Sequence, residues 1–244
     1  MLKSAGARAN PIQADGAYIV FASRSQIAVL CDFDGTATPC IVIDMLYHQF
    51  AAPSCLEMVK RWERGEIGTR EEMAACFATV TASCAEMERL LDSVPLDLAF
   101  PDLLEFCQHR GYHFAVVSDG LAWYIRYILD RHGVHNVQVY ANEIQFASDG
   151  LRLSFPWYSP CSPLRGTSKL ALAQRYKAEG LRVVFIGDGL SDIEVVEAAD
   201  VLYARASLLD YCRERHILAI PFSNLSEVLN DLRSRVELTH SDRQ

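Results

Sequence analysis

The fold of this chain is decided by Ile27-Ala28-Val29-Leu30-Cys31-Asp32-Phe33-Asp34-Gly35-Thr36. A short apolar run closed by a glycine turn is the pattern of a strand buried on both faces of a parallel sheet. In an open α/β sheet the carboxyl ends of neighbouring strands share one crevice, where ligands bind. We therefore expect Asp32 and Asp34 to lie at such a crevice.

After residue 100, helical and extended patterns alternate. Helices are expected over 101–110, 121–132, 168–178 and 225–236, and strands over 112–117, 137–140 and 182–186. A hairpin over 143–147 and 151–155 is expected to turn on Asp149-Gly150, a dipeptide favoured in short hairpin loops. Strand–helix alternation of this kind predicts an α/β fold with a Rossmann-like parallel sheet between layers of helices.

Residues 42–93 carry a purely helical pattern. Three Ser/Thr-x-x-Glu sequences, typical of capping boxes, precede apolar residues at helical spacing: Ser54 to Glu57, Thr69 to Glu72 and Ser83 to Glu86. We expect this segment to be an insertion in the α/β core. The predicted domains are a core over 17–37 and 100–244 and a helical unit over 38–99. Residues 1–16 are expected to form a flexible lead-in, and 18–21 a strand or packed arm.

Composition and charge exclude several classes of protein. The chain has 244 residues, 50% of them hydrophobic, which excludes disorder over its whole length. Its 31 acidic and 23 basic residues give a net charge of −8, so we expect no broad nucleic-acid-binding surface. No apolar stretch reaches the length of a membrane span or of a signal peptide's hydrophobic region. We therefore expect a cytoplasmic protein that binds a small molecule and no membrane.

The 8 cysteines form no Cys-x-x-Cys pair, and most lie in apolar runs. A buried thiol in such a run behaves as a small core side chain. Zinc sites and disulfide frameworks need tighter grouping, so we expect neither. The cysteine pattern therefore favours a reducing compartment.

Asp32 and Asp34 suit a division of roles in phosphoryl transfer. A carboxylate that a metal and cationic neighbours hold ionised can act as a nucleophile, which is the role we expect of Asp32. Asp34 can then protonate the leaving group and later deprotonate a water molecule. Gly35 permits a turn that brings backbone amides near a phosphate. The alternative is a surface turn after a strand, where Asp and Gly are common.

Ser118, Asp119, Gly120 and Lys169 are the candidate phosphate-binding residues. The first three follow an apolar strand at the expected start of a helix, where a hydroxyl group and free amides can bind an anion. An N-cap serine or aspartate is the alternative. Lys169 lies just inside a later helix and could neutralise phosphate charge, although a solvated helix lysine is the ordinary alternative.

Asp188 and Asp192 lie in Gly187-Asp188-Gly189-Leu190-Ser191-Asp192, directly after another apolar strand. Asp188 is expected to bind Mg²⁺ together with Asp32, because magnesium favours a few carboxylates, water and phosphate oxygens. Asp192, one helical turn later, is expected to orient the water ligands of the metal. A tight turn followed by a capped helix is the alternative.

These four pieces, in this order, resemble the four motifs of the haloacid-dehalogenase superfamily of phosphohydrolases. The resemblance implies an aspartyl-phosphate on Asp32 and acid–base catalysis by Asp34. It also implies Mg²⁺ bound by Asp32, by the backbone carbonyl of Asp34 and by Asp188, with Thr36 and Asp192 supporting the site. The helical unit resembles the C1 cap of this superfamily, as in phosphoserine phosphatase.

A closer resemblance, to the methylthiopentenyl-phosphate phosphatase-like branch, covers nearly all of residues 27–235. It is carried by Val117-Ser118-Asp119-Gly120, Tyr140-Ala141-Asn142, Phe155-Pro156 and Ile186-Gly187-Asp188-Gly189. Ile41 stands nine residues after Asp32, where phosphoserine enzymes carry a substrate-binding glutamate, and this departure argues against phosphoserine.

The resemblance implies Mg²⁺-dependent hydrolysis of a small phosphomonoester, with a sugar-like phosphate of the methionine-salvage type as one candidate. The alternatives are a phosphoserine phosphatase-like enzyme, a phosphotransferase that uses the same residues, and a non-catalytic sensor of a phosphorylated ligand.

Three further residues have no firm assignment. Trp62 stands at helical spacing with apolar neighbours, which favours packing within the helical unit over stacking on a substrate. Asp44 could contact the substrate, but a solvated helix carboxylate is the ordinary alternative. Tyr124 lies one turn into the helix after Ser118 and is assigned no role.

Overall fold

The computed structural model describes residues 27–148 and 150–241, so the predictions for 1–16 and 18–21 lie outside the described residues. The described chain forms a 7-stranded sheet in the order β4-β3-β2-β1-β5-β6-β7. Neighbouring strands are parallel except for β3 and β4, which are antiparallel. The strands are β1 (Ile27–Cys31), β2 (His113–Leu121), β3 (Gln138–Ala147), β4 (Gly150–Ser154), β5 (Arg182–Gly187), β6 (Val201–Ala204) and β7 (Ile220–Pro221). The predicted α/β class with a Rossmann-like, mostly parallel sheet is confirmed.

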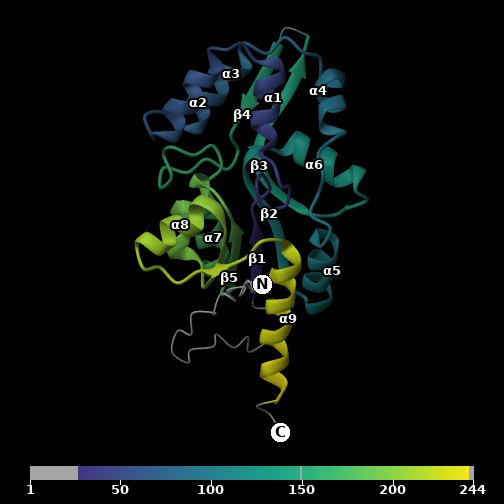
Figure 1. Cartoon of the computed structure of the whole chain (residues 1–244), viewed down its shortest axis with the longest axis vertical. Coiled ribbons are helices and arrows are strands. Elements are labelled where there is room, and N and C mark those ends of the chain that lie inside the picture. Colours follow the sequence, from purple (N-terminus) through teal and green to yellow (C-terminus); the bar gives the residue numbers. More distant parts are fainter. Residues whose placement is uncertain (1–26, 149, 242–244) are drawn as a thin grey trace, which may run out of the picture.

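Strand β1 lies in the middle of the sheet and is buried on both faces. Val29 belongs to the core that includes residues of α5 (Phe100–Arg110) and α9 (Leu225–Ser241). Leu30 belongs to the core that includes residues of α7 (Lys169–Ala178) and α8 (Ala206–Glu214). Figure 1 shows α7 and α8 on one side of the sheet and α5, α6 (Ala122–Arg131) and α9 on the other. Full burial of each branched apolar side chain of β1 stabilises the folded state by roughly 1.5–3 kcal/mol. This burial strongly favours the central position of the strand in the sheet.

Four helices connect β1 to α5. They are α1 (Val42–Phe50), α2 (Cys55–Glu63), α3 (Thr69–Phe77) and α4 (Cys84–Leu91). Figure 1 shows them grouped around the β3–β4 hairpin at one end of the molecule, whereas α5, α7, α8 and α9 lie towards the other end. None of the described helices combines the length and the apolarity that crossing a membrane requires.

One of the three predicted capping boxes forms. The Ser83 side chain accepts a hydrogen bond from the Glu86 backbone and the Glu86 side chain accepts one from the Ser83 backbone. Ser54 precedes α2 without a side-chain cap, and the N-cap of α3 is Gly68 rather than Thr69. The Thr69 prediction was wrong because its hydroxyl group donates to the buried Asp119 carboxylate instead, a contact between distant segments.

Two strands are longer than the sequence pattern predicts. The predicted strand 137–140 and the first hairpin strand are a single strand, β3, which continues to Ala147. Strand β2 runs through Ser118-Asp119-Gly120 to Leu121, with a register irregularity between Val117 and Leu121. These three residues therefore lie on an irregular strand end, and α6 begins after them.

Cys55 and Cys76 form a disulfide that joins α2 to α3. The expectation of unpaired core thiols was therefore wrong for these two residues. They are 21 residues apart in sequence, and the packing of α2 against α3 brings their Cα atoms to 4.8 Å. Because sequence spacing does not report this packing, it could not reveal the pair.

Candidate active site

Asp32 is buried at the carboxyl end of β1. Its backbone N–H donates to the Ile186 carbonyl at 2.9 Å, which extends the pairing of β1 with β5. Its Oδ1 atom lies 2.7 Å from Lys169 Nζ. Burial and the charge of Asp192 raise the pKa of the Asp32 carboxyl, and Lys169 opposes this shift. The strand end thus presents a carboxylate that depends on nearby cations to stay ionised.

Lys169 is the first residue of α7, and it is buried with its ammonium group at the centre of the site. Its Nζ atom also lies 2.5 Å from Asp192 Oδ1 and 3.1 Å from Ser191 Oγ. Burial alone would lower the pKa of Lys169, but the carboxylates of Asp192 and Asp32 more than reverse this, and the net shift is upward. Lys169 therefore carries a fixed positive charge beside Asp32.

Asp192 organises the turn that follows β5. Its Oδ2 atom accepts the backbone N–H groups of Asp188 and Gly189, both at 2.9 Å, while its Oδ1 atom accepts from Lys169. The Asp188 carboxylate accepts a hydrogen bond from the Thr36 hydroxyl group at 2.9 Å. Asp192 and Thr36 therefore hold Asp188 in place from two sides.

The carboxylates of Asp32, Asp188 and Asp192 lie close enough to hold a metal ion, with oxygens within 4.8 Å of one another. Asp192 is already occupied by Lys169 and the turn amides, which leaves Asp32 and Asp188 as side-chain ligands. Burial and the charge of Asp192 raise the pKa of Asp188 to about 6, so one lysine does not compensate the cluster. A hard, oxygen-binding divalent cation fits this set of donors, as predicted for Mg²⁺.

Two hydrogen bonds fix the position of the Asp34 carboxyl group. Its Oδ1 atom accepts the Val42 backbone N–H at 3.0 Å, at the start of α1, and its Oδ2 atom accepts from the Tyr124 hydroxyl group. Burial raises the pKa of Asp34 to about 7, and both hydrogen bonds oppose the shift. A carboxyl group that titrates near neutral pH can both donate and accept a proton.

Gly120 makes room for the contact between Tyr124 and Asp34. A Cβ atom at this position would collide with the Tyr124 hydroxyl group and would lie 2.8 Å from Asp34 Oδ2. The Gly120 backbone N–H donates to the Ser118 hydroxyl oxygen at 3.0 Å. Ser118 therefore accepts from Gly120 and keeps its own O–H available for another acceptor.

The Asp119 side chain makes a set of contacts that the sequence pattern did not predict. Its Oδ1 atom accepts the backbone N–H groups of Gly166 and Thr167, both at 2.9 Å, and its Oδ2 atom accepts from the Thr69 hydroxyl group at 2.5 Å. Asn142 Nδ2 donates to the Asp119 carbonyl oxygen at 2.6 Å. These bonds tie β2, the 166–167 loop and α3 together, so the Asp119 carboxylate is not free to contact a phosphate.

A cavity of about 250 Å³ connects these residues with the helices above them. We call its lining from the strand ends and from the segments that follow them the floor: Asp32, Asp34, Ser118, Asp119, Gly120, Asp188, Gly189, Leu190, Ser191 and Ser207. We call its lining from α1–α3 the roof: Ile43, Asp44, Tyr47, Val59, Trp62, Glu63, Thr69, Glu72 and Met73. Ile41, just before α1, also lines the cavity. Asp44 and Trp62, which the sequence left unassigned, therefore face the same space as Asp32.

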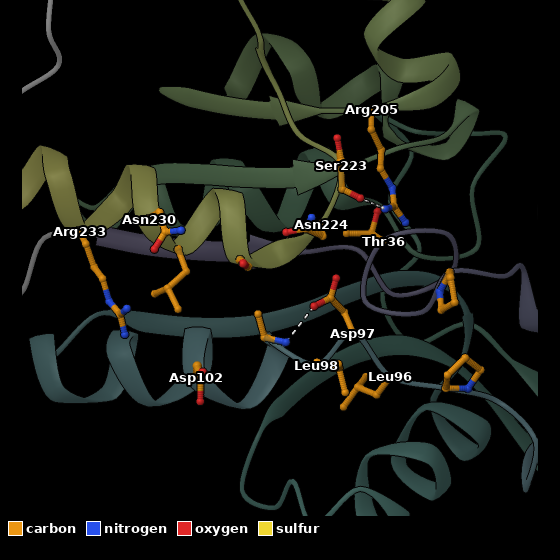
Figure 2. Close-up of a pocket in the computed structure, with 15 residues that line it drawn as sticks. Thr36, Leu96, Asp97, Leu98, Asp102, Arg205, Ser223, Asn224, Asn230 and Arg233 are labelled. Carbon is orange, nitrogen blue, oxygen red and sulfur yellow. Dashed lines mark hydrogen bonds between the residues drawn. The ribbon is translucent and has the colours of Figure 1, made fainter.

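A second cavity, of about 660 Å³, lies on the other side of Thr36, between the 95–99 segment and α9 (Figure 2). It is larger, but of the predicted site residues it contains only Thr36. Figure 2 shows Arg205 bonded to the Ser223 carbonyl group and the Asp97 carboxylate bonded within its own segment. The predicted site residues therefore converge on the smaller cavity.

Tyr124, Thr69 and Glu72 are the site residues that sequence reasoning missed. Tyr124 was noted without a role, and the other two were interpreted as parts of a capping box. A helical tyrosine has no sequence mark that distinguishes a core position from a contact with a catalytic carboxylate. The signal for Thr69 and Glu72 was present, but it was assigned to a local helix cap.

Comparison with known proteins agrees with this geometry. A family model described as haloacid dehalogenase-like hydrolase matches residues 29–197. A 2-hydroxy-3-keto-5-methylthiopentenyl-1-phosphate phosphatase of Exiguobacterium sp. is 28% identical over 204 residues, covering 82% of this chain and 94% of that protein. The protein of the same name from Bacillus thuringiensis is 26% identical over 218 residues, covering 87% and 98%.

A solved structure with a similar fold is the phospho-aspartyl intermediate analogue of phosphoserine phosphatase. It superimposes with a TM-score of 0.63 at 18% identity, and the match covers 84% of this chain and 98% of that one. Similarity at this level of identity concerns the fold.

Proposed function

This chain belongs to the haloacid dehalogenase-like hydrolase family, and we propose that it hydrolyses a small phosphomonoester through an aspartyl-phosphate on Asp32. The observation that carries the proposal is the 2.7 Å contact between Lys169 Nζ and Asp32 Oδ1, opposite a second carboxyl group poised near neutral pKa on Asp34. A nucleophile, a fixed cation and a separate acid are the parts that phosphoryl transfer requires.

The first chemical step forms the phosphorus–oxygen bond to Asp32 and breaks the bond to the ester oxygen. Asp34 gives its proton to that leaving oxygen, which departs as an alcohol. Tyr124 and the Val42 amide hold the Asp34 carboxyl group at this position.

In the second step a water molecule attacks the phosphorus atom of the aspartyl-phosphate. The Asp34 carboxylate, left ionised by the first step, accepts a proton from that water. The bond between phosphorus and the Asp32 oxygen breaks, which releases inorganic phosphate and restores both carboxyl groups.

Charge neutralisation comes from the floor of the cavity. Asp32, Asp188 and the Asp34 backbone carbonyl would hold Mg²⁺, which when bound supplies positive charge against the phosphate oxygens. The transferring phosphate would be bound by the Ser118 hydroxyl group, the Asp119 backbone amide and Lys169, while the Gly120 amide positions Ser118.

We assign residues 38–99 as a cap over the α/β core, for which the sequence predicts 17–37 and 100–244, because the helices of the cap supply the roof of the cavity. The partner is a small phosphorylated metabolite, and the substrate named for the Exiguobacterium and Bacillus relatives is one candidate. A cytoplasmic location remains part of the proposal. The Cys55–Cys76 disulfide weighs against it, because disulfides persist mainly in oxidising compartments.

The test is release of inorganic phosphate from a panel of small phosphomonoesters. We expect release that depends on Mg²⁺ and stops when a chelator is added. Transfer of phosphate to an added alcohol, in preference to water, would instead favour the phosphotransferase. Magnesium-independent release, or none from any ester, would overturn the proposal.

A further inference from the structure

The cavity is lined by acids and by no lysine or arginine side chain among the described residues. Its carboxyl groups come from both sides: Asp32, Asp34, Asp119 and Asp188 from the floor, and Asp44, Glu63 and Glu72 from the roof. A phosphomonoester is itself anionic. Its binding in such a cavity therefore requires compensating positive charge.

The floor carboxyl groups have compensating partners within the protein. Lys169 contacts Asp32, and a divalent cation suits Asp32 and Asp188. Asp34 titrates near neutral pH with hydrogen-bond donors on both oxygens, and the Asp119 carboxylate accepts from four donors. The floor therefore has the positive charge that the phosphate group of a substrate requires.

Among the described residues, no lysine or arginine lines the cavity beside the roof carboxyl groups. Glu72 is buried, with 6% of its surface exposed, and its described hydrogen bond is a long one of 3.4 Å from the Tyr47 hydroxyl group. Burial, Asp44 and Asp119 raise the pKa of Glu72 to about 8, against the Tyr47 hydrogen bond. Burial and Glu63 also raise the pKa of Asp44, and His48 opposes that shift.

Arg165 is the cation that approaches the roof from outside. Its guanidinium carbon lies 5.7 Å from the centre of the Trp62 ring. It donates to the Leu190 carbonyl group at 2.8 Å and pairs with Glu194 at 3.6 Å. It lines the neighbouring cavity behind Trp62, together with Glu63, and does not line the catalytic cavity itself.

The remaining roof residues suit a small organic cation. Trp62 and Tyr47 are aromatic, and Ile43, Val59 and Met73 are apolar. Aromatic faces beside carboxylates attract ammonium groups, including alkylated ones. The volume of about 250 Å³ is below the usual range for ligand pockets, which limits the group to a few heavy atoms.

We propose that the substrate is the phosphomonoester of a small amino alcohol, whose cationic nitrogen binds between Glu72, Asp44 and the Trp62 ring. This inference rests on the proposed function and adds a substrate class to it. Esters whose alcohol carries a carboxylate are rejected, because the roof offers that group no cation. The phosphate lies on the floor and the nitrogen against the roof, so the substrate spans the cavity.

Matched pairs of esters test the proposal with the unmodified protein and Mg²⁺. O-phosphoethanolamine is compared with propyl phosphate. Phosphocholine is compared with its uncharged isostere, in which a tert-butyl group replaces the trimethylammonium group. We expect the value of kcat/KM to be at least about tenfold higher for the cation in one or both pairs. Phosphoserine, which adds a carboxylate, is expected to be slower than O-phosphoethanolamine.

Two roof variants, Glu72→Gln and Asp44→Asn, are each expected to bring the cation-to-neutral ratio several-fold closer to one. The control is Glu57→Gln on α2, an exposed carboxylate that pairs with Arg64 and does not line the cavity. Its ratio is expected to match that of the unmodified protein. The ratio for the unmodified protein needs no variant, so misfolding of a variant does not remove the test.

The outcomes separate the two levels of the proposal. Hydrolysis of neutral esters as fast as their cationic partners overturns the amino-alcohol inference and leaves the phosphatase proposal standing. A cation preference that both roof variants retain in full also overturns it, because the recognition then lies elsewhere. No hydrolysis of any ester overturns the proposed function, and this inference with it.

Discussion

The floor and the roof of the catalytic cavity both carry buried carboxyl groups, but the protein treats them differently. On the floor, Asp32 shares the Lys169 ammonium group with the neighbouring Asp192, at 2.7 and 2.5 Å from Nζ. On the roof, Glu72 has a single long hydrogen bond from Tyr47, and no lysine or arginine of the described chain lines the cavity beside it. An ionised carboxylate buried without a partner is costly, so Glu72 keeps its proton at neutral pH until a ligand supplies positive charge.

This difference separates chemistry from selectivity. The floor residues come from strand ends that the α/β sheet brings together in a fixed geometry. The roof residues come from three short helices whose packing is specific to this chain.

The largest effect is expected from Asp32→Asn on the floor. The amide cannot form the aspartyl-phosphate, so we expect kcat to fall by at least about 10⁴-fold. The melting temperature should hardly change, since the variant removes one of several crowded carboxylates without altering shape. Phosphate release and thermal unfolding measure the two quantities. Activity above about one per cent of the unmodified level would show that Asp32 is not the nucleophile, and Asp102→Asn on α5 serves as the control.

The next effect concerns the support of the roof. Reducing the Cys55–Cys76 disulfide should lower the free energy of unfolding by about 3 kcal/mol, as expected for a loop of this length. That loss corresponds to a melting temperature about 6–12 °C lower with reductant than without it. The Cys161→Ser variant should show the same difference, because this exposed thiol takes no part in the disulfide. Identical melting curves with and without reductant would contradict the pairing.

A smaller effect is expected from Gly120→Ala on the floor. The added methyl group would displace the Tyr124 hydroxyl group and Asp34, and misplacing the acid should lower kcat by about 10²-fold. Tyr124→Phe removes the oxygen that the methyl group meets most closely. The double variant should therefore lose less than the sum of the two single losses, measured in activation free energy. If the losses of the two single variants simply add in the double variant, Gly120 does not act through the contact between Tyr124 and Asp34.

The smallest effect is the pH dependence of stability through Glu72 on the roof. The pKa of Glu72 is raised from 4.5 to about 8 in the folded protein. Between these values the folded protein holds a proton that the unfolded chain has released, so the free energy of unfolding falls as pH rises. Between pH 6 and 7.5, this single group should account for a loss of about 2 kcal/mol.

The Glu72→Gln variant tests this contribution, because the amide does not titrate. Denaturant unfolding at several pH values should show a shallower loss of stability in the variant than in the unmodified protein. Parallel curves for the two proteins would mean that Glu72 is ionised in the folded state, and that the roof already has its cation.

The sequence predicted the core of the fold well because the strands of a parallel sheet are buried on both faces. Strand β1 begins and ends where the apolar run Ile27–Cys31 does. The errors fall where tertiary contacts override local pattern. Thr69 bonds to Asp119 rather than capping α3, and β3 continues through the segment that separates two predicted strands.

The site residues also fall into those that the sequence could predict and those that it could not. Asp32, Lys169, Asp188 and Asp192 follow strands or begin a helix, so the topology alone brings them together. Tyr124, Glu72 and the partners of Asp119 depend on how helices pack on that framework. Spacing along the chain carries no record of this packing, and the Cys55–Cys76 disulfide was missed for the same reason.

The buried network around Lys169 also has a thermodynamic consequence for binding. A long flexible lysine loses about 2 kcal/mol of rotamer entropy when it is fixed in one position. Because Asp192 and Ser191 already fix Lys169, that entropy is lost when the chain folds rather than when a phosphate arrives. Phosphate affinity should therefore depend little on the ordering of this side chain, and the entropy of substrate binding should report mainly on the helices above it.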